Sequence, residues 1–156
     1  MLPEVETYIE RLRAARAEIL KLLEGLSVDA LNWQPLPAET NSLYALATHS
    51  LGAERYWLHG LVGRRKVERD RAAEFHARGE DIAALRAAYA AAARESEEIL
   101  ARLVESDMAA ERGEAPKTRL VRWCILHVAE HYSEHLGQMR LTRQMWENRA
   151  ARPHEI

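Results

Sequence analysis

Histidines are the residues of this sequence whose type and spacing point most directly to chemistry. The chain of 156 residues contains seven of them, and His127, His131 and His135 follow one another at intervals of four. Residues four apart lie on the same face of an α-helix, about 6 Å apart along its axis. Two imidazoles at this spacing can bind one metal ion, and such pairs recur in zinc sites. The spacing therefore predicts a metal site on the helix that carries these histidines.

A catalytic metal site commonly has three protein ligands and one open position for water or substrate. His49 is the candidate for the third ligand, because it lies in the middle of a second apolar helical stripe. That stripe comprises Leu43, Leu46, His49, Ala53, Tyr56 and Gly60, with Trp57 beside it. A single histidine on an apolar face is usually a hydrogen-bonded core residue, but several convergent polar groups without partners would cost about 1–3 kcal/mol each. A shared metal ion is the interpretation that removes this cost.

Four long helical patterns must position these residues. The first starts at Pro3 and stops before Gly25, the second covers about residues 42–61 with Thr40 or Asn41 as its cap, the third covers about 81–105, and the fourth about 118–147. Ser27 is suited to cap a short helical turn between the first two. The core-facing positions of the fourth helix are predicted to be Leu120, Cys124, His127, His131, Glu134 or His135, Gln138, Leu141 and Met145. No strand pattern competes, so the sequence predicts an all-α fold, a four-helix bundle.

The connection between the second and third helices, residues 62–80, is unusually long. Connections in helix bundles usually contain about 2–8 residues. A connection of this length can cross the bundle, so the two helices need not be antiparallel neighbours. Its charge run, residues 64–71, is interpreted as a solvated loop, with a lid over a site as the alternative.

Composition limits the classes of protein to which the chain can belong. With 47% hydrophobic and 29% charged residues, it is expected to form one domain over residues 1–148, followed by a polar tail at 149–156. The net charge of -2 predicts no nucleic-acid or anionic-membrane partner, and neither a membrane-spanning run nor a signal-peptide pattern is found. The single cysteine, Cys124, excludes an internal disulfide and is expected to be a buried apolar filler. We therefore expect a soluble, cytoplasmic protein with a small-molecule substrate.

The run from His131 to Gln138 resembles the fourth-helix signature of the DinB/YfiT-like family, His-x-x-x-His-x-Gly-Gln. That family also has a histidine in the middle of its second helix, followed by aromatic residues, as His49 is here. The segments Leu-Asn-Trp-Gln-Pro at 31–35 and Arg-Asp-Arg-Ala-Ala-Glu-Phe at 69–75 are similar to further family stretches. The resemblance covers nearly the whole chain. It implies a four-helix bundle with long connections and unusual DinB-like topology, a three-histidine metal site and a homodimer.

The resemblance implies His49, His131 and His135 as the metal ligands. Residues expected to support the ligands or to line a pocket are His127, Gln138, Glu134 and Trp57. Of these, His127 is also considered as a fourth ligand, and Gln138 could orient a ligand or a bound water. The other three histidines, His59, His76 and His154, are predicted to be peripheral. Glu54 is expected to be solvated or paired in a salt bridge, without a role.

Some relatives are metal-dependent transferases or isomerases that use low-molecular-weight thiols such as mycothiol or bacillithiol. The resemblance therefore suggests a thiol-dependent S-transferase, and a hydrolase is equally compatible with the site. Three imidazoles suit Zn²⁺ first, with Ni²⁺ and Fe²⁺ also compatible. The run His-x-x-Glu-His also fits an inverted zinc-protease motif with Glu134 as general base, but such a site needs a further acidic ligand and a peptide cleft. A non-catalytic metal-binding or stress-related bundle is the alternative from another class.

Overall fold

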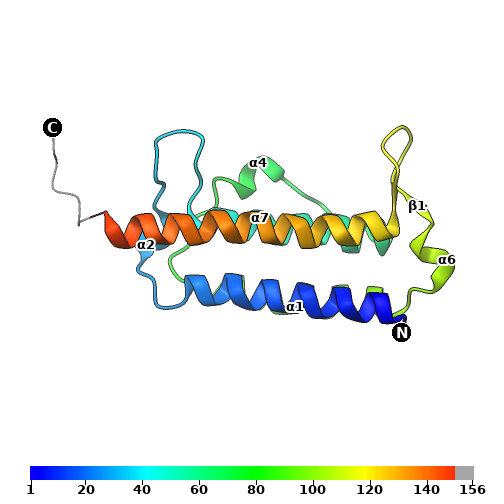
Figure 1. The fold of residues 1–156 in the computed structure, drawn as a ribbon. Helices are drawn as coiled ribbons and strands as arrows, with labels where there is room; N and C mark the ends of the chain where they lie inside the picture. Colours follow the sequence, from blue (N-terminus) through cyan, green and yellow to red (C-terminus); the bar gives the residue numbers. More distant parts are fainter. Residues whose placement is uncertain (150–156) are drawn as a thin grey trace.

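Four long helical segments form the fold in a computed structural model that describes residues 1–149. They are α1 (Pro3–Leu23), α3 (Leu43–Glu54) continued by the π-helix η1 (Arg55–Val62), α5 (Ala83–Ala101) and α7 (Val121–Asn148). Figure 1 shows α1 and α7 running in one direction and α3 and α5 in the other. The predicted all-α four-helix bundle is confirmed. Apart from Arg149, the predicted polar tail lies outside the described residues, and the domain limits remain a prediction.

The helix starts follow from local sequence. Pro3 occupies the first turn of α1, and Glu4 and Glu6 place negative charge at its N-terminus, where the helix dipole favours it. The hydroxyl of Ser27 accepts from the backbone N–H of Ala30 and caps α2 (Val28–Asn32), as predicted. The cap of α3 is Ser42 rather than Thr40 or Asn41, because its hydroxyl is the one that accepts the backbone N–H three residues later.

Short elements occupy the connections. They are α4 (Arg71–Glu74), α6 (Glu105–Met108) and two strands, β1 (Glu111–Arg112) and β2 (Arg119–Leu120), which pair antiparallel. The expectation of no strand is wrong at this hairpin, because two-residue strands are too short to show an alternating pattern. The connection containing α4 lets α3 and α5 run in the same direction. The loop 33–42, α4 and the hairpin project on the same side of the bundle (Figure 1).

The face of α7 that packs into the bundle differs from the predicted one. Its buried residues are Val121, Cys124, Ile125, Val128, Tyr132, His135, Leu136, Met139 and Thr142. Of the predicted stripe, only Cys124 and His135 are buried, whereas Leu120, Leu141 and Met145 are 43%, 58% and 41% exposed. Both stripes have the three-four spacing of a helix face. The one with more aliphatic side chains packs against the core, and the one with the histidines faces the projecting connections.

The π-helix η1 changes the register of the second long helix. In a π-helix the N–H bonds the carbonyl five residues earlier, as the N–H of Gly63 does with Leu58, so side chains beyond Glu54 are rotated relative to an α-helix. Tyr56, predicted to face inward, is therefore exposed, and His59, predicted to be peripheral, is buried. A Cβ on Gly63 would lie 2.8 Å from the carbonyl oxygen of His59, so this end of η1 requires glycine. No helix within residues 1–149 is long and apolar enough to cross a membrane.

Candidate metal centre

Three histidines from two helices converge beneath α4. His49 comes from the middle of α3, and His131 and His135 come from adjacent turns of α7. The Nε2 atom of His131 lies 3.1 Å from Nε2 of His49 and 3.2 Å from Nε2 of His135. The three ligand atoms lie within 4.8 Å of one another. We refer to these residues as the histidine cluster.

The outer ring nitrogens of two of the histidines are already engaged. Nδ1 of His49 donates to the Glu74 carboxylate at 2.9 Å, and Nδ1 of His135 donates to the amide oxygen of Gln138 at 2.8 Å. In a neutral ring that donates from Nδ1, Nε2 carries a lone pair. Lone pairs of His49 and His135 therefore both point at Nε2 of His131, which can donate to only one of them.

A metal ion fits this donor set. Three nitrogens bound tetrahedrally at about 2.0–2.1 Å from one zinc ion lie about 3.3 Å apart, close to the two short nitrogen distances of the cluster. A cation between the rings would accept all three lone pairs. Partners on Nδ1 that fix the orientation of a metal-binding imidazole are usual for such sites. The histidine cluster thus has the donors and the outer support that a three-histidine metal site requires.

Two of the three rings have pKa values that favour the neutral form. Burial, together with the neighbouring rings of His135 and His49, lowers the pKa of His131 to about 3. Burial also lowers the pKa of His49, outweighing the opposite effect of its hydrogen bond to Glu74. Because a protonated imidazole cannot bind a metal, these lowered pKa values keep His49 and His131 ready to do so at neutral pH.

The segment Arg69 to Phe75 covers one side of the cluster. The Phe75 ring stacks on His49 with centroids 4.1 Å apart, and Arg69 pairs with the Glu74 carboxylate at 2.7 Å. Burial alone would raise the pKa of Glu74, but the hydrogen bonds from Arg69 and His49 leave it lowered. The solvated-loop interpretation of residues 64–71 is right for Lys66 and Glu68, both 87% exposed, but wrong for Arg69, whose side chain is 15% exposed and packs as the lid alternative expects.

Gly52 makes the approach of Glu74 possible. It lies one turn after His49 in α3, and a Cβ at this position would lie 1.9 Å from a carboxylate oxygen of Glu74. Sequence reasoning did not identify the roles of Glu74, Arg69 or Gly52. The resemblance at 69–75 and a glycine inside an apolar helix were the available signals, but neither indicates which side chain contacts His49.

The other predicted site residues lie at different places. His127 stands outside the cluster, with its ring stacked on Trp123 at 4.7 Å and in contact with Trp57 at 4.8 Å, so it is not placed as a fourth ligand. Gln138 contacts His135, as described. Glu134 is exposed, and no hydrogen bond or ion pair joins it to a histidine among residues 1–149. No contact of Glu134 supports either the zinc-protease role or a role in orienting the ligands.

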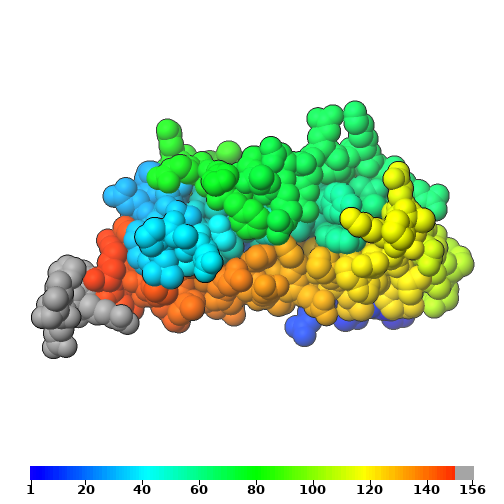
Figure 2. Space-filling model, turned by 90° about the horizontal axis from the view of Figure 1, so that it is seen from above, coloured from blue at the N-terminus to red at the C-terminus, as the bar shows by residue number. Residues whose placement is uncertain are grey.

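Two hollows flank the cluster along α7. The apolar hollow, of about 330 Å³, lies between α7 and the loop 33–42 and includes Gln138 in its wall. The hairpin hollow, of about 720 Å³, lies between η1 and the β1–β2 hairpin and includes Trp57 in its wall. Figure 2 shows the loop (cyan) and the hairpin (yellow) on either side of the green segment that contains α4. Neither hollow is lined by a histidine of the cluster: the apolar hollow reaches it through Gln138, and the hairpin hollow is linked to it through Trp57 and His127.

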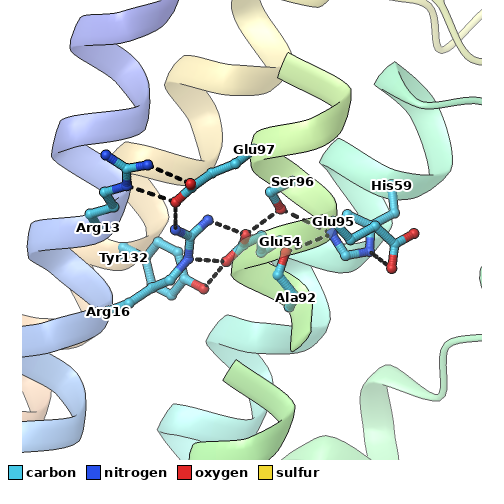
Figure 3. Close-up of polar contacts among 9 residues, drawn as sticks. All are labelled: Arg13, Arg16, Glu54, His59, Ala92, Glu95, Ser96, Glu97 and Tyr132. Atoms are coloured by element: carbon cyan, nitrogen blue, oxygen red, sulfur yellow. Dashed lines mark hydrogen bonds and ion pairs between the residues drawn. The ribbon is translucent and has the colours of Figure 1, made fainter. Parts of the chain in front are cut away.

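A second polar cluster lies deeper in the bundle (Figure 3). The Glu54 carboxylate, fully buried, accepts hydrogen bonds from Arg16 of α1, Ser96 of α5 and Tyr132 of α7. Burial would raise the pKa of Glu54, but these donors, Arg16 above all, leave it lowered. His59 continues the network with Nε2 2.9 Å from the Ser96 hydroxyl. The predicted salt bridge of Glu54 is thus present, in the core rather than in solvent.

Three further predictions concern Cys124 and the histidines His76 and His154. Cys124 is fully buried, and burial raises the pKa of its thiol, which fits the predicted apolar filler. His76 is exposed, as predicted, and His154 lies outside the described residues.

Solved structures share this fold. A conserved protein from Enterococcus faecalis is 12% identical with a TM-score of 0.77, covering 93% of this chain and 98% of its own. A DinB-like protein from Bacillus cereus is 17% identical with a TM-score of 0.72, covering 91% of this chain and 92% of its own. Likeness at these identities shows the fold alone. No curated protein matches the sequence significantly.

A family model described as mycothiol-S-transferase matches residues 7–147, a stretch that includes the three histidines and the connections that cover them. The chain therefore belongs to the mycothiol-S-transferase family of the DinB superfamily.

Proposed function

We propose that this protein is a metal-dependent S-transferase that joins a low-molecular-weight thiol, mycothiol first, to an electrophilic small molecule. The observation that carries the proposal is the convergence of three Nε2 atoms whose rings at His49 and His135 are already fixed by hydrogen bonds at Nδ1. The family match supports the choice of thiol. Zn²⁺ is the expected metal, and Ni²⁺ and Fe²⁺ have the same ligand preference.

A divalent metal held by three neutral imidazoles lowers the pKa of a thiol at its open position, because no ligand offsets the charge of the ion. The chain's own residues hold and shield that position. Glu74 and Gln138 orient the rings of His49 and His135, and Arg69 balances the charge of Glu74. Phe75, stacked on His49, excludes water from one side. In the transfer, the thiol proton goes to solvent, sulfur forms a bond to carbon, and the leaving group departs with the electron pair of the broken bond.

The test combines metal content and turnover. Protein purified without added metal is analysed for transition metals, then assayed for mycothiol-dependent loss of a nitro-activated aryl chloride. We expect bound metal, a higher melting temperature on adding Zn²⁺, and turnover in the wild type. His131→Ala should abolish turnover. It should also weaken metal binding by more than roughly 10–100-fold, the usual effect of removing a residue that only hydrogen-bonds a ligand. His76→Ala is the matched control, because His76 is exposed and lies outside the cluster.

Three outcomes would contradict the proposal. Less than about one-tenth of an equivalent of metal, with no rise in melting temperature on adding Zn²⁺ or Ni²⁺, would mean that the cluster does not bind metal. Loss of the aryl chloride at the same rate without thiol would favour the hydrolase. Metal binding without turnover of any electrophile would favour the non-catalytic bundle.

A further inference from the structure

We infer that the apolar hollow is the binding site for the second substrate and that this substrate is an uncharged, apolar electrophile. The inference rests on the proposed function and adds to it the place and chemical class of the co-substrate. The hollow shares one residue with the metal centre. Gln138 lines its wall and also accepts a hydrogen bond from Nδ1 of His135. A ligand in the hollow would thus lie one side chain away from a metal-binding ring.

Half of the residues that line the hollow are apolar, and none is a cation. The apolar ones are Pro35, Leu36, Leu46, Leu141 and Met145. Of these, Leu36, Leu141 and Met145 are 56%, 58% and 41% exposed, and a contiguous group of exposed apolar side chains marks an interaction site. The volume of about 330 Å³ lies within the range of small-molecule sites. These features suit a compact apolar molecule.

The one charged residue in the lining is acidic. Glu39 lies in the wall, and no lysine or arginine accompanies it. A carboxylate there repels an anionic ligand and leaves an uncharged one unaffected. The hollow therefore selects against anionic electrophiles as well as in favour of apolar ones.

Hydrogen bonds hold the loop wall in place. The Thr40 hydroxyl donates to the carbonyl of Leu36 at 2.9 Å and accepts from its N–H at 3.0 Å. The amide of Gln34 donates to the carbonyl of Thr40 at 2.9 Å. Glu39 adopts a positive φ of 61°, a conformation that costs energy for a residue other than glycine and that clusters at ligand-binding sites. The hollow is thus formed before any ligand arrives.

The hairpin hollow differs in that its lining contains cations. Lys117 and Arg119, with one acid, Glu114, line it together with the aromatic rings of Tyr56 and Trp57. Aromatic faces and hydrogen-bond donors suit a polar, sugar-bearing thiol better than an apolar electrophile. The apolar hollow reaches the cluster through Gln138, whereas the hairpin hollow is linked to it through Trp57 and His127, so thiol and electrophile would approach it from different sides.

The chemical step limits what the electrophile can be. For an aryl or alkyl halide, the thiolate sulfur forms a carbon–sulfur bond while the carbon–halogen bond breaks, and the halide leaves with its electron pair. The thiol proton goes to solvent, and neither an oxidant nor a reductant is needed.

The experiment compares two forms of one nitro-activated aryl chloride, the methyl ester and the free carboxylate. Metal-loaded full-length protein is assayed with mycothiol and each form, and kcat/KM is measured. Glu39→Lys should raise the ratio of kcat/KM for the carboxylate to kcat/KM for the ester about fivefold, because it replaces a repulsive charge by an attractive one. Glu10→Lys, which makes the same change of charge at an exposed position on α1, should leave the ratio unchanged. Leu141→Asp should raise KM for the ester about tenfold.

A binding measurement separates this inference from the proposed function. The ester with hydrogen in place of chlorine cannot react, and its affinity is measured by calorimetry on wild type and Leu141→Asp. Weaker binding to the variant supports the inference even if no electrophile is turned over. The inference would be overturned if the protein turns over both forms but Glu39→Lys leaves the kcat/KM ratio unchanged and Leu141→Asp leaves the affinity for the unreactive ester unchanged. The proposed function would still stand. Conversion of a dimer to a monomer by Leu141→Asp, with unchanged kinetics, would instead assign this surface to a second copy of the chain.

Discussion

The bundle contains two polar clusters that share α3 and α7, and they differ in how their groups are paired. Around Glu54, a carboxylate that only accepts meets three groups that donate, from Arg16, Ser96 and Tyr132. Within residues 1–149, the one buried donor there that makes no hydrogen bond, Nη1 of Arg16, lies 3.9 Å from the Glu97 carboxylate, so we call this the complete cluster. In the histidine cluster, Nε2 atoms face one another at 3.1 and 3.2 Å, and at most one hydrogen is available between them. This is the incomplete cluster, whose unmatched lone pairs a bound cation would satisfy.

This difference suggests that the Glu54 cluster stabilises the fold and that the histidine cluster binds a ligand. A buried charge with its partners in place stabilises a single arrangement of the helices, whereas unmatched lone pairs are tolerated where a ligand will satisfy them. The largest effect is therefore expected from removing one partner of the buried ion pair in the complete cluster.

Glu54→Gln should lower the free energy of unfolding by about 3 kcal/mol, because it leaves the buried Arg16 charge with only the more distant Glu97 carboxylate, 3.9 Å away, as a counter-ion. Arg16→Met should cost a similar amount by leaving the carboxylate alone. The double variant should recover most of the loss, since glutamine can still accept from Ser96 and Tyr132. Urea denaturation of the metal-free protein measures all three.

The exposed pair Arg140–Glu18 provides the control for this prediction. The two side chains are 52% and 45% exposed, so Glu18→Gln should cost less than about 1 kcal/mol. Equal losses for Glu54→Gln and Glu18→Gln would remove the distinction between the complete core cluster and an ordinary surface pair.

A smaller effect is expected from weakening the support of the incomplete cluster. Glu74→Gln should lower the affinity for Zn²⁺ about 10–100-fold, because a neutral amide no longer strengthens the His49 ring as a donor. The stability of the metal-free protein should change by less than about 1 kcal/mol, since Glu74 is not part of the core network. Competition with a chromogenic chelator measures the affinity. Glu68 lies in the same connection and is 87% exposed, so Glu68→Gln should not change the affinity for Zn²⁺. An equal loss of affinity in Glu68→Gln would contradict the role of Glu74.

The smallest effect should come from a complete but exposed pair, and it depends on pH. Hydrogen bonds from Arg122 and Tyr8 lower the pKa of Glu4 to about 2. Because the folded pKa is lower than the unfolded one, the stabilisation is present above about pH 4.5 and is lost as the pH falls towards 2. Glu4→Gln should cost less than about 1 kcal/mol at pH 7, after allowance for solvent screening.

Urea denaturation of wild type and Glu4→Gln at about pH 7 and pH 3 measures that dependence. The difference between the two proteins should narrow at the lower pH and in high salt. A difference that widens on acidification would mean that Glu4 is not stabilised in its charged form.

The sequence predicts those features that depend on local spacing. Pro3 and Ser27 mark helix starts through bonds within one turn, and the interval between His131 and His135 places two rings on one face. The convergence of His49 with them followed from its place in an apolar stripe. The helix starts and the His131–His135 spacing are properties of a single helix, whereas the convergence also required that the two stripes face each other.

What escaped prediction depends on contacts between distant elements. The choice between two stripes on α7 is decided by packing against α1 and α3, and spacing alone does not distinguish them. The π-helix after Glu54 shifts every later side chain of its helix, and no local pattern announced it. Glu74 reaches His49 across 25 positions of sequence, through a gap left by Gly52.

The position of the histidines along the chain has a consequence for biosynthesis. His49 and His131 are 82 residues apart, and His131 lies on α7, which follows the other three long helices in the sequence. If the cluster binds a metal as proposed, a nascent or truncated chain that lacks α7 has one ligand of three. Metal binding would then follow the docking of α7, and by mass action the ion would favour only the state in which α7 has docked.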